Sequence, residues 1–439
     1  MGICILVIAC VFEVAFMAYC MQTKAYHNKA KSWVWIAACI TFVLGILTPI
    51  IEWSFRWYAL TAILAIFAVA GAIRLLTKKF GKRPYRTWRV VIKGIRMMVI
   101  VAIAVMPAII FPQYESPKST GGYAVDTVSY TFTDASRIET FTNTGEHRKV
   151  TAAFWYPKRA GGKYPLVVFS HGAFGVRMSN ASTFMELANN GYVVCSIDHP
   201  YHAAGTVDMD GKLTLGSRAF MREVIDANSD VYSEEEQFEL INKWMGLRTG
   251  DIGFVLDTIR KNTESKSDEV YKRIDKSKTG LIGHSLGGAA SVQLGRVRDD
   301  IGAVINLDGS MLGGEYGLNR DGDVVISEEP YPLPLLNFYS EYVVNELKAD
   351  PEYVYSNRFI SSISPKAFEV CIRGSNHMSY TDLPLFSPLL AKKLSGISEG
   401  TTKATVDPYY CIETMNTLVL EFFNCFLKGE GSFVSREYY

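Results

Sequence analysis

The sequence predicts a doubly wound, mostly parallel α/β sheet that is preceded by four membrane-spanning helices. Three observations lead to this fold class. Four apolar runs of about 20 residues, the length that spans a bilayer, precede residue 112. From residue 125 onward, short apolar runs typical of buried strands alternate with helical stretches. The stretch GHSLG at residues 283–287 then joins one of these strands to a helix of small residues.

Residues 1–112 form the predicted transmembrane region. Its runs carry few charges: Glu13 lies in the first, and Lys93 and Arg96 lie at the start of the fourth, where their side chains can reach the membrane interface. Buried helices of a soluble domain are the alternative, but such helices usually show a polar stripe and these runs have almost none. The predicted helices cover residues 3–21, 33–51, 57–76 and 90–111.

Basic residues are distributed unevenly among the connections between these runs. The second connection carries only Glu52 and Arg56, whereas the first and third are strongly basic. The positive-inside rule therefore puts the first and third connections in the cytoplasm and everything after Phe111 outside it, in a multi-pass protein of the cell membrane. A cleaved signal peptide is disfavoured, because no basic residue precedes the first run. The basic residues are Lys24, Lys29 and Lys31 in the first connection, and Lys78, Lys79, Lys82, Arg83, Arg86 and Arg89 in the third.

Residues 113–124, rich in Pro, Ser, Lys and Gly, form the predicted linker to a soluble domain at residues 125–439. Two stretches with β-branched, alternating patterns, 125–133 and 149–156, predict an antiparallel start of the sheet. The strands that follow alternate with helices, which favours a doubly wound arrangement. They are predicted near residues 165–169, 192–197, 279–282, 301–307, 335–339 and 368–372.

Ser285 lies at the centre of a G-x-S-x-G motif, which is typical of a nucleophile elbow. The motif requires a strand before it and a helix after it, and both are predicted here. The glycines allow a tight turn that presents the serine hydroxyl at the top of the sheet. The helix N-terminus behind the serine favours the negative charge that develops in acyl transfer. A Gly-rich turn without catalytic function is the alternative, and the flanking elements disfavour it.

A base and an acid should follow Ser285 in the order acid, then histidine. His377 is the only histidine after Ser285 and follows a predicted strand, so it is the predicted base. Two carboxylates are candidates for the acid: Asp308 follows the strand after the elbow helix, and Glu341 follows the next strand. We favour Asp308, because it stands at an abrupt strand exit, whereas Glu341 suits the first turn of a helix.

A glycine-flanked loop at residues 170–175 follows the early strand at 165–169. Enzymes with a nucleophile elbow place their second oxyanion donor in such a loop, the first being the amide after the nucleophile. We therefore predict the backbone N–H groups of Leu286 and Ala173 as oxyanion donors, and a structural function for His171 in holding the loop. These features together predict an α/β-hydrolase fold.

The acid-rich stretch 206–247 is out of step with the strand–helix alternation and predicts a lid over the site rather than a solvated insertion. Before it, Asp198, His199 and His202 could suggest a metal site. No further ligand stands out at a suitable spacing, so we interpret this segment as a loop that lines the acyl pocket.

Several classes of partner are not indicated by the sequence. Serine chemistry of this kind requires neither a metal nor a cofactor. Neither a nucleotide-binding loop nor a nucleic-acid-binding patch is evident, and the net charge is only +1. The eight cysteines do not suggest a disulfide framework.

Four segments resemble the platelet-activating factor acetylhydrolase family, meaning its plasma and type II enzymes and their bacterial relatives. The resemblance runs from about residue 150 to 428, with 203–244 unmatched, and its most specific feature is an Asp directly after the strand that follows the elbow helix. It implies that Ser285 is the nucleophile, Asp308 the orienting acid and His377 the base. The segments are FSHGAFG (169–175), GHSLGG (283–288), NLDGSM (306–311) and IRGSNHMSYTD (372–382).

The resemblance implies hydrolysis of short or oxidised acyl esters, such as the sn-2 acetyl group of phospholipids. The expected protein is a membrane-anchored serine esterase whose catalytic domain is extracytoplasmic and whose partners are the bilayer and a small ester or phospholipid. A broad carboxylesterase or a polyester-type hydrolase on the same fold is one alternative. A catalytically silent domain that only binds a partner is another, and the intact Ser, Asp and His disfavour it.

Overall fold

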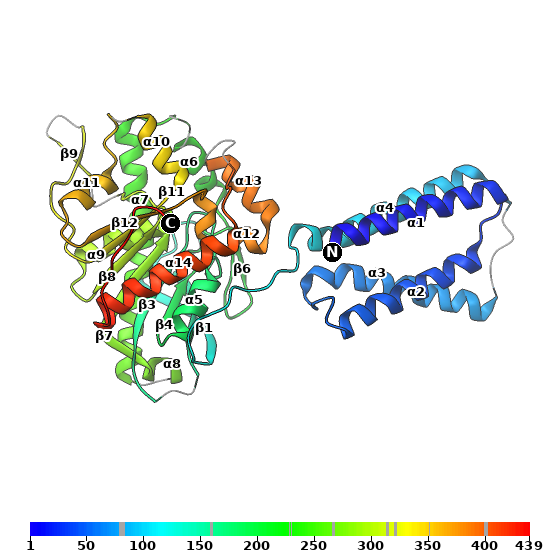
Figure 1. Cartoon of the computed structure of the whole chain (residues 1–439), viewed down its shortest axis with the longest axis horizontal. Coiled ribbons are helices and arrows are strands. Elements are labelled where there is room, and N and C mark those ends of the chain that lie inside the picture. Colours follow the sequence, from blue (N-terminus) through cyan, green and yellow to red (C-terminus); the bar gives the residue numbers. More distant parts are fainter. Residues whose placement is uncertain are drawn as a thin grey trace. The chain divides into compact units, whose positions relative to one another are not determined.

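The computed structural model describes residues 1–78, 84–158, 161–227, 229, 231–265, 268–312, 316–319, 323–350, 352–398 and 403–439 (Figure 1). It contains two compact units, one of Met1–Glu115 with Phe386–Leu390, the other of Ser116–Leu385 with Ala391–Tyr439. Lys79, Lys82 and Arg83 of the predicted third connection lie outside the described residues, as do positions 228 and 230 of the predicted lid.

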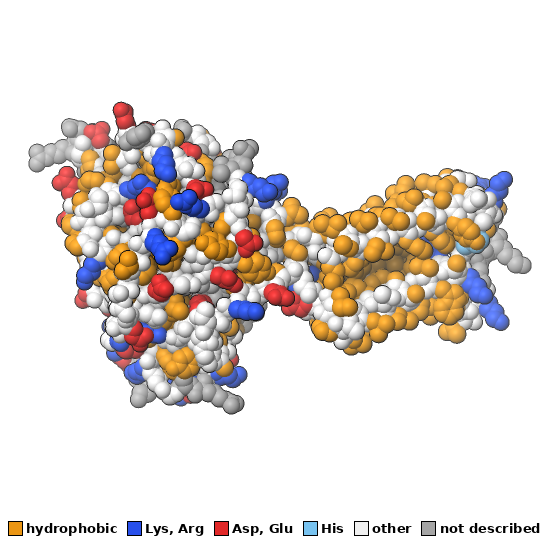
Figure 2. Space-filling model, in the orientation of Figure 1, with side chains coloured by type: hydrophobic (Ala, Val, Ile, Leu, Met, Phe, Trp, Pro, Cys, Tyr) orange, Lys and Arg blue, Asp and Glu red, His pale blue; other side chains and the backbone are white. Residues whose placement is uncertain are grey.

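The first unit is built from four long apolar helices. Helix α1 packs against α4, and α2 packs against α3. All four are long and apolar enough to cross a membrane, with mean hydropathy of 2.5, 1.8, 2.3 and 2.1 in chain order. Figure 2 shows apolar side chains over the visible face of these helices. The elements are α1 (Gly2–Thr23), α2 (Asn28–Leu47), η1 (Phe55–Trp57), α3 (Tyr58–Thr77) and α4 (Thr87–Ile110).

The second helix differs most from its predicted bounds. It ends at Leu47 rather than at residue 51, because Pro49 follows and the residue before a proline is kept out of the helical region. It also begins earlier, at Asn28, so that Lys31 lies in its first turns rather than in a connection. There Nζ of Lys31 lies 2.8 Å from Oε2 of Glu13, so the acid of the first apolar run is paired.

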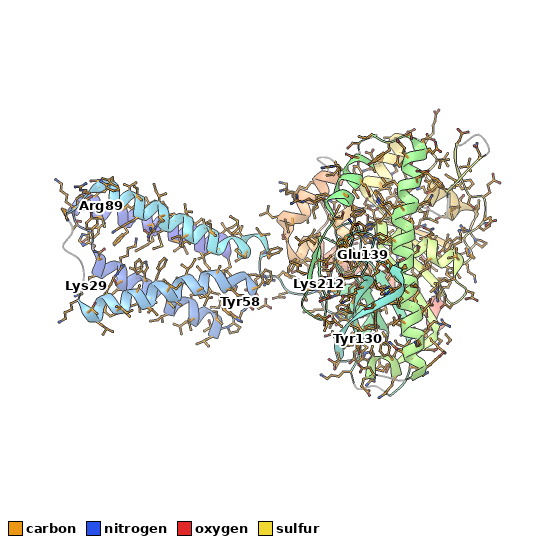
Figure 3. The ribbon with its side chains drawn as sticks, turned by 180° about the vertical axis from the view of Figure 1, so that it is seen from behind. Lys29, Tyr58, Arg89, Tyr130, Glu139 and Lys212 are labelled. Atoms are coloured by element: carbon orange, nitrogen blue, oxygen red, sulfur yellow. The ribbon has the colours of Figure 1, made fainter. Side chains whose placement is uncertain are left out.

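The basic ends of these helices lie together. Lys29 and Arg89 are at one end of the unit, and Tyr58 is at the other (Figure 3). Since Lys29 stands at the start of α2 and Arg89 at the start of α4, the first and third connections share one end, as expected for four antiparallel helices.

An eight-stranded sheet in the order β1-β2-β4-β3-β7-β8-β11-β12 forms the centre of the second unit. Strand β2 is antiparallel to both β1 and β4, and the other neighbours are parallel. All eight strands correspond to strands predicted from the sequence, and the mixed, mostly parallel α/β-hydrolase-like sheet is confirmed. The strands are β1 (Val125–Ile138), β2 (His147–Pro157), β3 (Tyr164–Ser170), β4 (Val193–Ile197), β7 (Ile274–His284), β8 (Ala303–Leu307), β11 (Leu335–Ser340) and β12 (Ala367–Ile372).

Helices cover both faces of this sheet, so its central strands are buried on both sides. Strands β4 and β8 are buried along their whole length, as their apolar sequences require. Helices α5 (Ala181–Asn189) and α14 (Pro408–Phe423) lie in front of the sheet in Figure 1. Helix α7 (Glu234–Ser265) lies in front of it in the reverse view of Figure 3, and α9 (Leu286–Val297) packs against α7.

The predicted lid contains a hairpin of β5 (Gly205–Val207) and β6 (Leu213–Leu215), helix α6 (Arg218–Ala227) and the first half of α7. Helix α7 continues past residue 247, so the predicted end of the insertion falls inside a helix. Phe220 of α6 is buried: its ring stacks 3.7 Å from His202 and meets Trp244 edge-on at 5.5 Å.

The remaining elements connect the core strands or follow the sheet. They are α8 (Glu269–Lys272), β9 (Tyr316–Leu318), β10 (Val324–Ile326), α10 (Glu341–Ala349), α11 (Ser356–Ile363), η2 (His377–Tyr380), α12 (Leu383–Phe386), α13 (Pro388–Ser398) and η3 (Asn424–Lys428).

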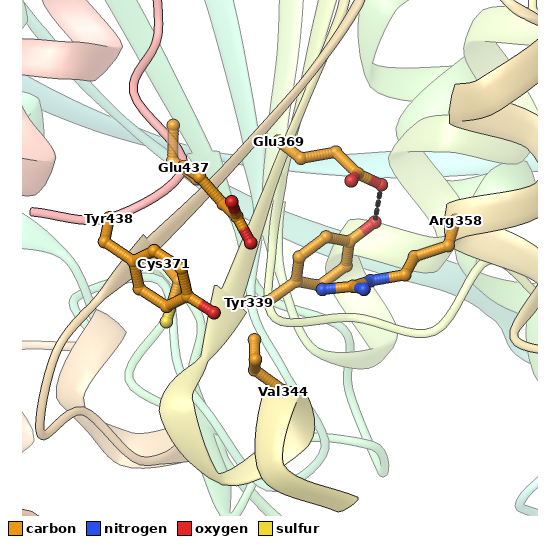
Figure 4. A pocket seen from close by; sticks show the side chains of 8 residues that line it. Tyr339, Val344, Arg358, Glu369, Cys371, Glu437 and Tyr438 are labelled. Carbon is orange, nitrogen blue, oxygen red and sulfur yellow. Dashed lines mark hydrogen bonds between the residues drawn. The ribbon is translucent and has the colours of Figure 1, made fainter. Parts of the chain in front are cut away.

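C-terminal residues cover the edge of the sheet beside β12. The Cys371 amide donates to the Glu437 carbonyl at 2.8 Å, and the Cys371 carbonyl accepts from the Tyr439 amide at 2.9 Å. A small pocket at this edge is lined by Cys371, Glu437 and Tyr438, and by Tyr339, whose hydroxyl donates to Glu369 (Figure 4). The unpaired backbone groups of an edge strand can pair with another chain, and at Cys371 these groups are paired within the protein.

Candidate active site

Ser285 stands in the sharp turn between β7 and α9. Its backbone angles, φ 54° and ψ −126°, lie outside the regions that most residues adopt, and its amide donates to the Leu307 carbonyl at 2.9 Å. The neighbouring glycines are required by close backbone approach. A Cβ at Gly283 would lie 2.2 Å from the Gly287 carbonyl oxygen, and one at Gly287 would lie 2.1 Å from that of Ser170. The turn therefore has the geometry of a nucleophile elbow.

Asp308 and His377 are brought together at the ends of two strands. Oδ2 of Asp308 lies 2.8 Å from Nδ1 of His377, and Oδ1 of Asp308 accepts from the Ser340 amide at 2.6 Å. The carboxylate is 1% exposed and the imidazole 19% exposed. With its Nδ1–H donated to the carboxylate, the imidazole carries its basic lone pair on Nε2.

Glu341, the competing acid, begins helix α10. Its Oε2 accepts from the Gly374 amide at 2.9 Å, and its own amide donates to Oγ of Ser375 at 3.2 Å. Both partners belong to the loop that carries His377. The structure thus brings Asp308 to the imidazole and gives Glu341 a contact with the backbone of the loop.

His284, which sequence reasoning treated only as the variable residue before the serine, also belongs to the site. Its Nε2–H donates to the His377 carbonyl at 2.9 Å, and the two rings are 4.5 Å apart. Burial, and then the neighbouring His377, lower the pKa of His284 to about 3, so its ring is neutral at neutral pH. The position of a histidine inside the G-x-S-x-G motif is the sequence signal that could have indicated this contact with His377.

The predicted oxyanion loop lies directly beside the nucleophile. A Cβ at Gly172 would lie 3.1 Å from the Cβ of Ser285. The buried ring of His171 holds this loop: Nδ1 lies 2.7 Å from the Gly172 carbonyl oxygen, and Nε2 accepts from the His199 amide at 3.1 Å. Burial, and then Arg248, lower the pKa of His171 well below its ordinary value, so the ring is neutral, with its proton on Nδ1.

Two amides remain available beside Ser285. Within the part of the chain that the structure describes, neither the Ala173 nor the Leu286 amide donates to a protein acceptor. The following amides of the loop are used: Phe174 donates to the His202 carbonyl at 2.8 Å, and Gly175 donates to that of Gly172 at 3.1 Å. The amide of Leu286, at the start of α9, is one of the donors that a helix N-terminus leaves unpaired.

The polar side chains of the loop after β4, Asp198, His199 and His202, contact other residues of the protein. Asp198 accepts from the Arg177 amide at 2.7 Å, and His202 stacks on Phe220. His199 lies between two buried groups, with Nδ1 2.9 Å from Oδ2 of Asp251 and Nε2 2.9 Å from Oγ of Ser170. No group of three metal-ligating side chains is found among the described residues. The side chains of Asp198, His199 and His202 are thus buried in contacts with other parts of the protein.

Comparison with known proteins relates most of the soluble unit to one family. A family model described as platelet-activating factor acetylhydrolase, isoform II, matches residues 139–435. The platelet-activating factor acetylhydrolase of Canis lupus familiaris is 26% identical over 287 residues, covering 62% of this chain and 59% of that protein. A probable 1-alkyl-2-acetylglycerophosphocholine esterase of Arthroderma benhamiae is 24% identical over 279 residues, covering 61% of this chain and 62% of that protein. The chain thus spans less than two thirds of these relatives' length.

Among solved structures, a ferulic acid esterase from Streptomyces cinnamoneus is similar, with a TM-score of 0.55 at 21% identity. The likeness covers 73% of this chain and 94% of that protein, and it shows the shared fold.

Proposed function

The chain belongs to the platelet-activating factor acetylhydrolase isoform II family, as its motifs predicted, and from this premise we propose that it is a membrane-anchored serine esterase of short-chain acyl esters. Its distant homology to acetylhydrolases and esterases supports a carboxylic ester hydrolase. The proposed substrate is the sn-2 acetyl, or another short or oxidised acyl group, of a phospholipid. The names of the mammalian and fungal relatives support this choice.

In the proposed reaction, Oγ of Ser285 attacks the ester carbonyl carbon while Nε2 of His377 takes the hydroxyl proton. The carbonyl oxygen becomes an oxyanion, which accepts hydrogen bonds from the amides of Leu286 and Ala173, each worth about 3–4 kcal/mol in comparable sites. Collapse of this intermediate breaks the ester bond, and the imidazolium gives its proton to the leaving alcohol. Water then attacks the acyl-enzyme with His377 again as base, which releases the acid and restores Ser285. Asp308 holds the imidazole in the required tautomer throughout.

The observation that carries this proposal is the 2.8 Å contact between Asp308 and His377, at the same sheet edge as the strained turn at Ser285. A serine nucleophile at a tight turn, an imidazole oriented by a carboxylate and two amides beside the serine are what acyl transfer needs. The intact set disfavours a silent binding domain.

The proposed location is the cell membrane, with the catalytic unit outside the cytoplasm. The four apolar helices support membrane insertion. The basic first and third connections support the orientation, because such connections remain in the cytoplasm.

A fluorophosphonate probe tests the proposed nucleophile. The full-length protein in detergent should be labelled, Ser285→Ala should not, and Ser277→Ala, which removes an exposed serine of β7, should be labelled like the wild type. Hydrolysis of p-nitrophenyl acetate through octanoate, and of acetyl and long-chain phospholipids, then defines the substrate. A folded wild type that is not labelled, or Ser285→Ala that is labelled equally, would contradict the proposal.

A further inference from the structure

Arg248 is a fully buried cation of helix α7 whose guanidinium ends on the oxyanion loop. It is 0% exposed. Nη1 donates to the His171 carbonyl, and Nη2 donates to the Gly172 carbonyl at 3.2 Å. Its Nε lies 3.4 Å from Nδ1 of His202. The guanidinium therefore hydrogen-bonds neutral groups, two of which are successive carbonyls beside the nucleophile.

These contacts fix the peptide that joins Gly172 to Ala173. Its carbonyl oxygen accepts from two buried side chains, Nη2 of Arg248 and Nδ1 of His171. In a trans peptide the N–H points away from the C=O. Holding the Gly172 oxygen on one side therefore directs the Ala173 N–H to the opposite side. Since Gly172 lies directly beside Ser285, this peptide is placed to deliver an N–H to the reacting carbonyl.

The charge of Arg248 is only partly balanced nearby. Asp251, one turn further along α7, acts on this charge, but its carboxylate is shared with three other groups: Arg148 at 2.6 Å, Arg137 at 2.9 Å and His199 at 2.9 Å. Burial, and then the charge of Arg148, lower the pKa of Arg248 to about 9 against the opposing effect of Asp251, so the guanidinium stays charged at neutral pH. A buried positive charge acts through a low dielectric and favours an anion formed close by.

The same turn of α7 supports the loop by a second route. Asp251 accepts from Nδ1 of His199, and the His199 amide in turn donates to Nε2 of His171. Burial lowers the pKa of His199 to about 4, so the ring is neutral and keeps these hydrogen bonds at neutral pH. Arg248 and Asp251 thus both reach the oxyanion loop from one helix.

We propose that Arg248 is a positioning residue of the oxyanion hole, which orients the Gly172–Ala173 peptide toward Ser285 and adds a favourable charge. The proposal rests on the proposed esterase function, and it adds a residue that touches neither the substrate nor the triad.

The test uses the full-length protein in detergent with two substitutions and a matched control. Arg248→Gln removes the charge and the pair of donors that reaches both carbonyls. Arg248→Lys keeps the charge but can hydrogen-bond only one carbonyl well. Arg260→Gln is the control, because Arg260 lies on the same helix and pairs with Asp300 at the surface. We expect Arg248→Gln to lower kcat for p-nitrophenyl acetate by about 10- to 10³-fold, the upper value being that of a lost oxyanion donor. Arg248→Lys should lose less, and Arg260→Gln should match the wild type.

A trifluoromethyl ketone inhibitor separates positioning from general support of the fold. It forms a tetrahedral adduct with the serine and so needs the oxyanion hole, whereas KM reports the ester ground state. The Ki of this inhibitor should rise by the same factor by which kcat falls, with KM nearly unchanged. If Arg248→Gln does not fold, as judged by near-UV circular dichroism, the same comparison is made on Arg248→Lys. Unchanged kcat and Ki in the folded variant overturn the proposal, whereas a wild type without esterase activity overturns the proposed function instead.

Discussion

Oδ2 of Asp308 lies 2.8 Å from Nδ1 of His377, although 69 residues separate them in the chain. Strand β11 explains the contact. It pairs in parallel with β8, which ends just before Asp308, and with β12, which ends shortly before His377. Because parallel strands end at the same edge of a sheet, both side chains emerge there. Glu341, directly after β11, is the second carboxylate at this edge, and substitution of each acid separately distinguishes the two.

Asp308→Asn should lower kcat by about 10⁴-fold with the fold intact, because the imidazole then loses the partner that sets its tautomer. Glu341→Gln should change kcat little, since its carboxylate contacts the Gly374 amide and an amide oxygen can replace it. Hydrolysis of p-nitrophenyl acetate measures both, with circular dichroism as the control for folding. A large loss in Glu341→Gln together with an active Asp308→Asn would reverse the assignment of the acid.

Activity should fall steeply as the acyl chain lengthens beyond a few carbons. Phe220 of the insertion is buried against His202 of the loop after β4, so opening the insertion for a long acyl chain would expose this ring. Relative kcat/KM for p-nitrophenyl acetate, butyrate, octanoate and palmitate measures the effect. Equal values for acetate and palmitate would favour a lipase over a short-chain esterase.

A cysteine at position 119 should react with an impermeant maleimide in intact cells, and one at position 29 should react only after permeabilisation. Ser119 follows the last apolar helix, Lys29 lies in the first turn of α2 next to the basic first connection, and both are exposed. The background should carry alanine in place of the native cysteines that are not buried, which are Cys4, Cys10, Cys39 and Cys425. The reverse labelling pattern would place the soluble unit in the cytoplasm.

The soluble unit should lose stability as the pH falls below about 6.5. Burial lowers the pKa of His199 to about 4 and that of His284 to about 3, whereas both titrate near 6.5 in the unfolded chain. The unfolded state therefore binds more protons between these values, and each such histidine removes up to about 1.4 kcal/mol per pH unit as the pH falls.

Urea midpoints between pH 8 and pH 5 measure this dependence. Burial also lowers the pKa of His202 well below its ordinary value. His202→Phe therefore supplies the control, because phenylalanine can keep the stack on Phe220 while one such histidine is removed. Its stability should vary less with pH than that of the wild type. A midpoint that does not change over this range would show that these histidines are not neutral in the fold.

The sheet could be predicted from sequence because each of its strands carries its own local signal. Short apolar runs such as residues 303–307 are recognisable without knowledge of their neighbours, and Ser285 is marked by the glycines that its turn requires. The second helix shows the limit of this approach, since its ends depend on Pro49 and on the pairing of Lys31 with Glu13 rather than on hydropathy alone.

The polar network behind the site could not be predicted. His199, Asp251 and Arg248 come from two separate segments, and a charged residue on a helix is usually solvated. Their burial is decided by long-range packing of α7 against the sheet, which leaves no local pattern. The pairing of C-terminal residues with Cys371 is hidden for the same reason, because the tail has no strand-like sequence.

Helix α7 belongs to the insertion at its first half and carries the residues that contact the loop at Gly172. It is one continuous element of 32 residues that contacts α6 through Trp244 and carries Arg248 and Asp251 near its middle. A helix of that length is about 48 Å long and moves nearly as a rod, since each residue adds about 1.5 Å and every turn is hydrogen-bonded to the next. Phe220 of the insertion packs on Trp244, one turn of α7 before Arg248, whose guanidinium holds the Gly172 carbonyl. The packing of the insertion and the geometry of the loop at Gly172 therefore depend on one and the same stretch of helix.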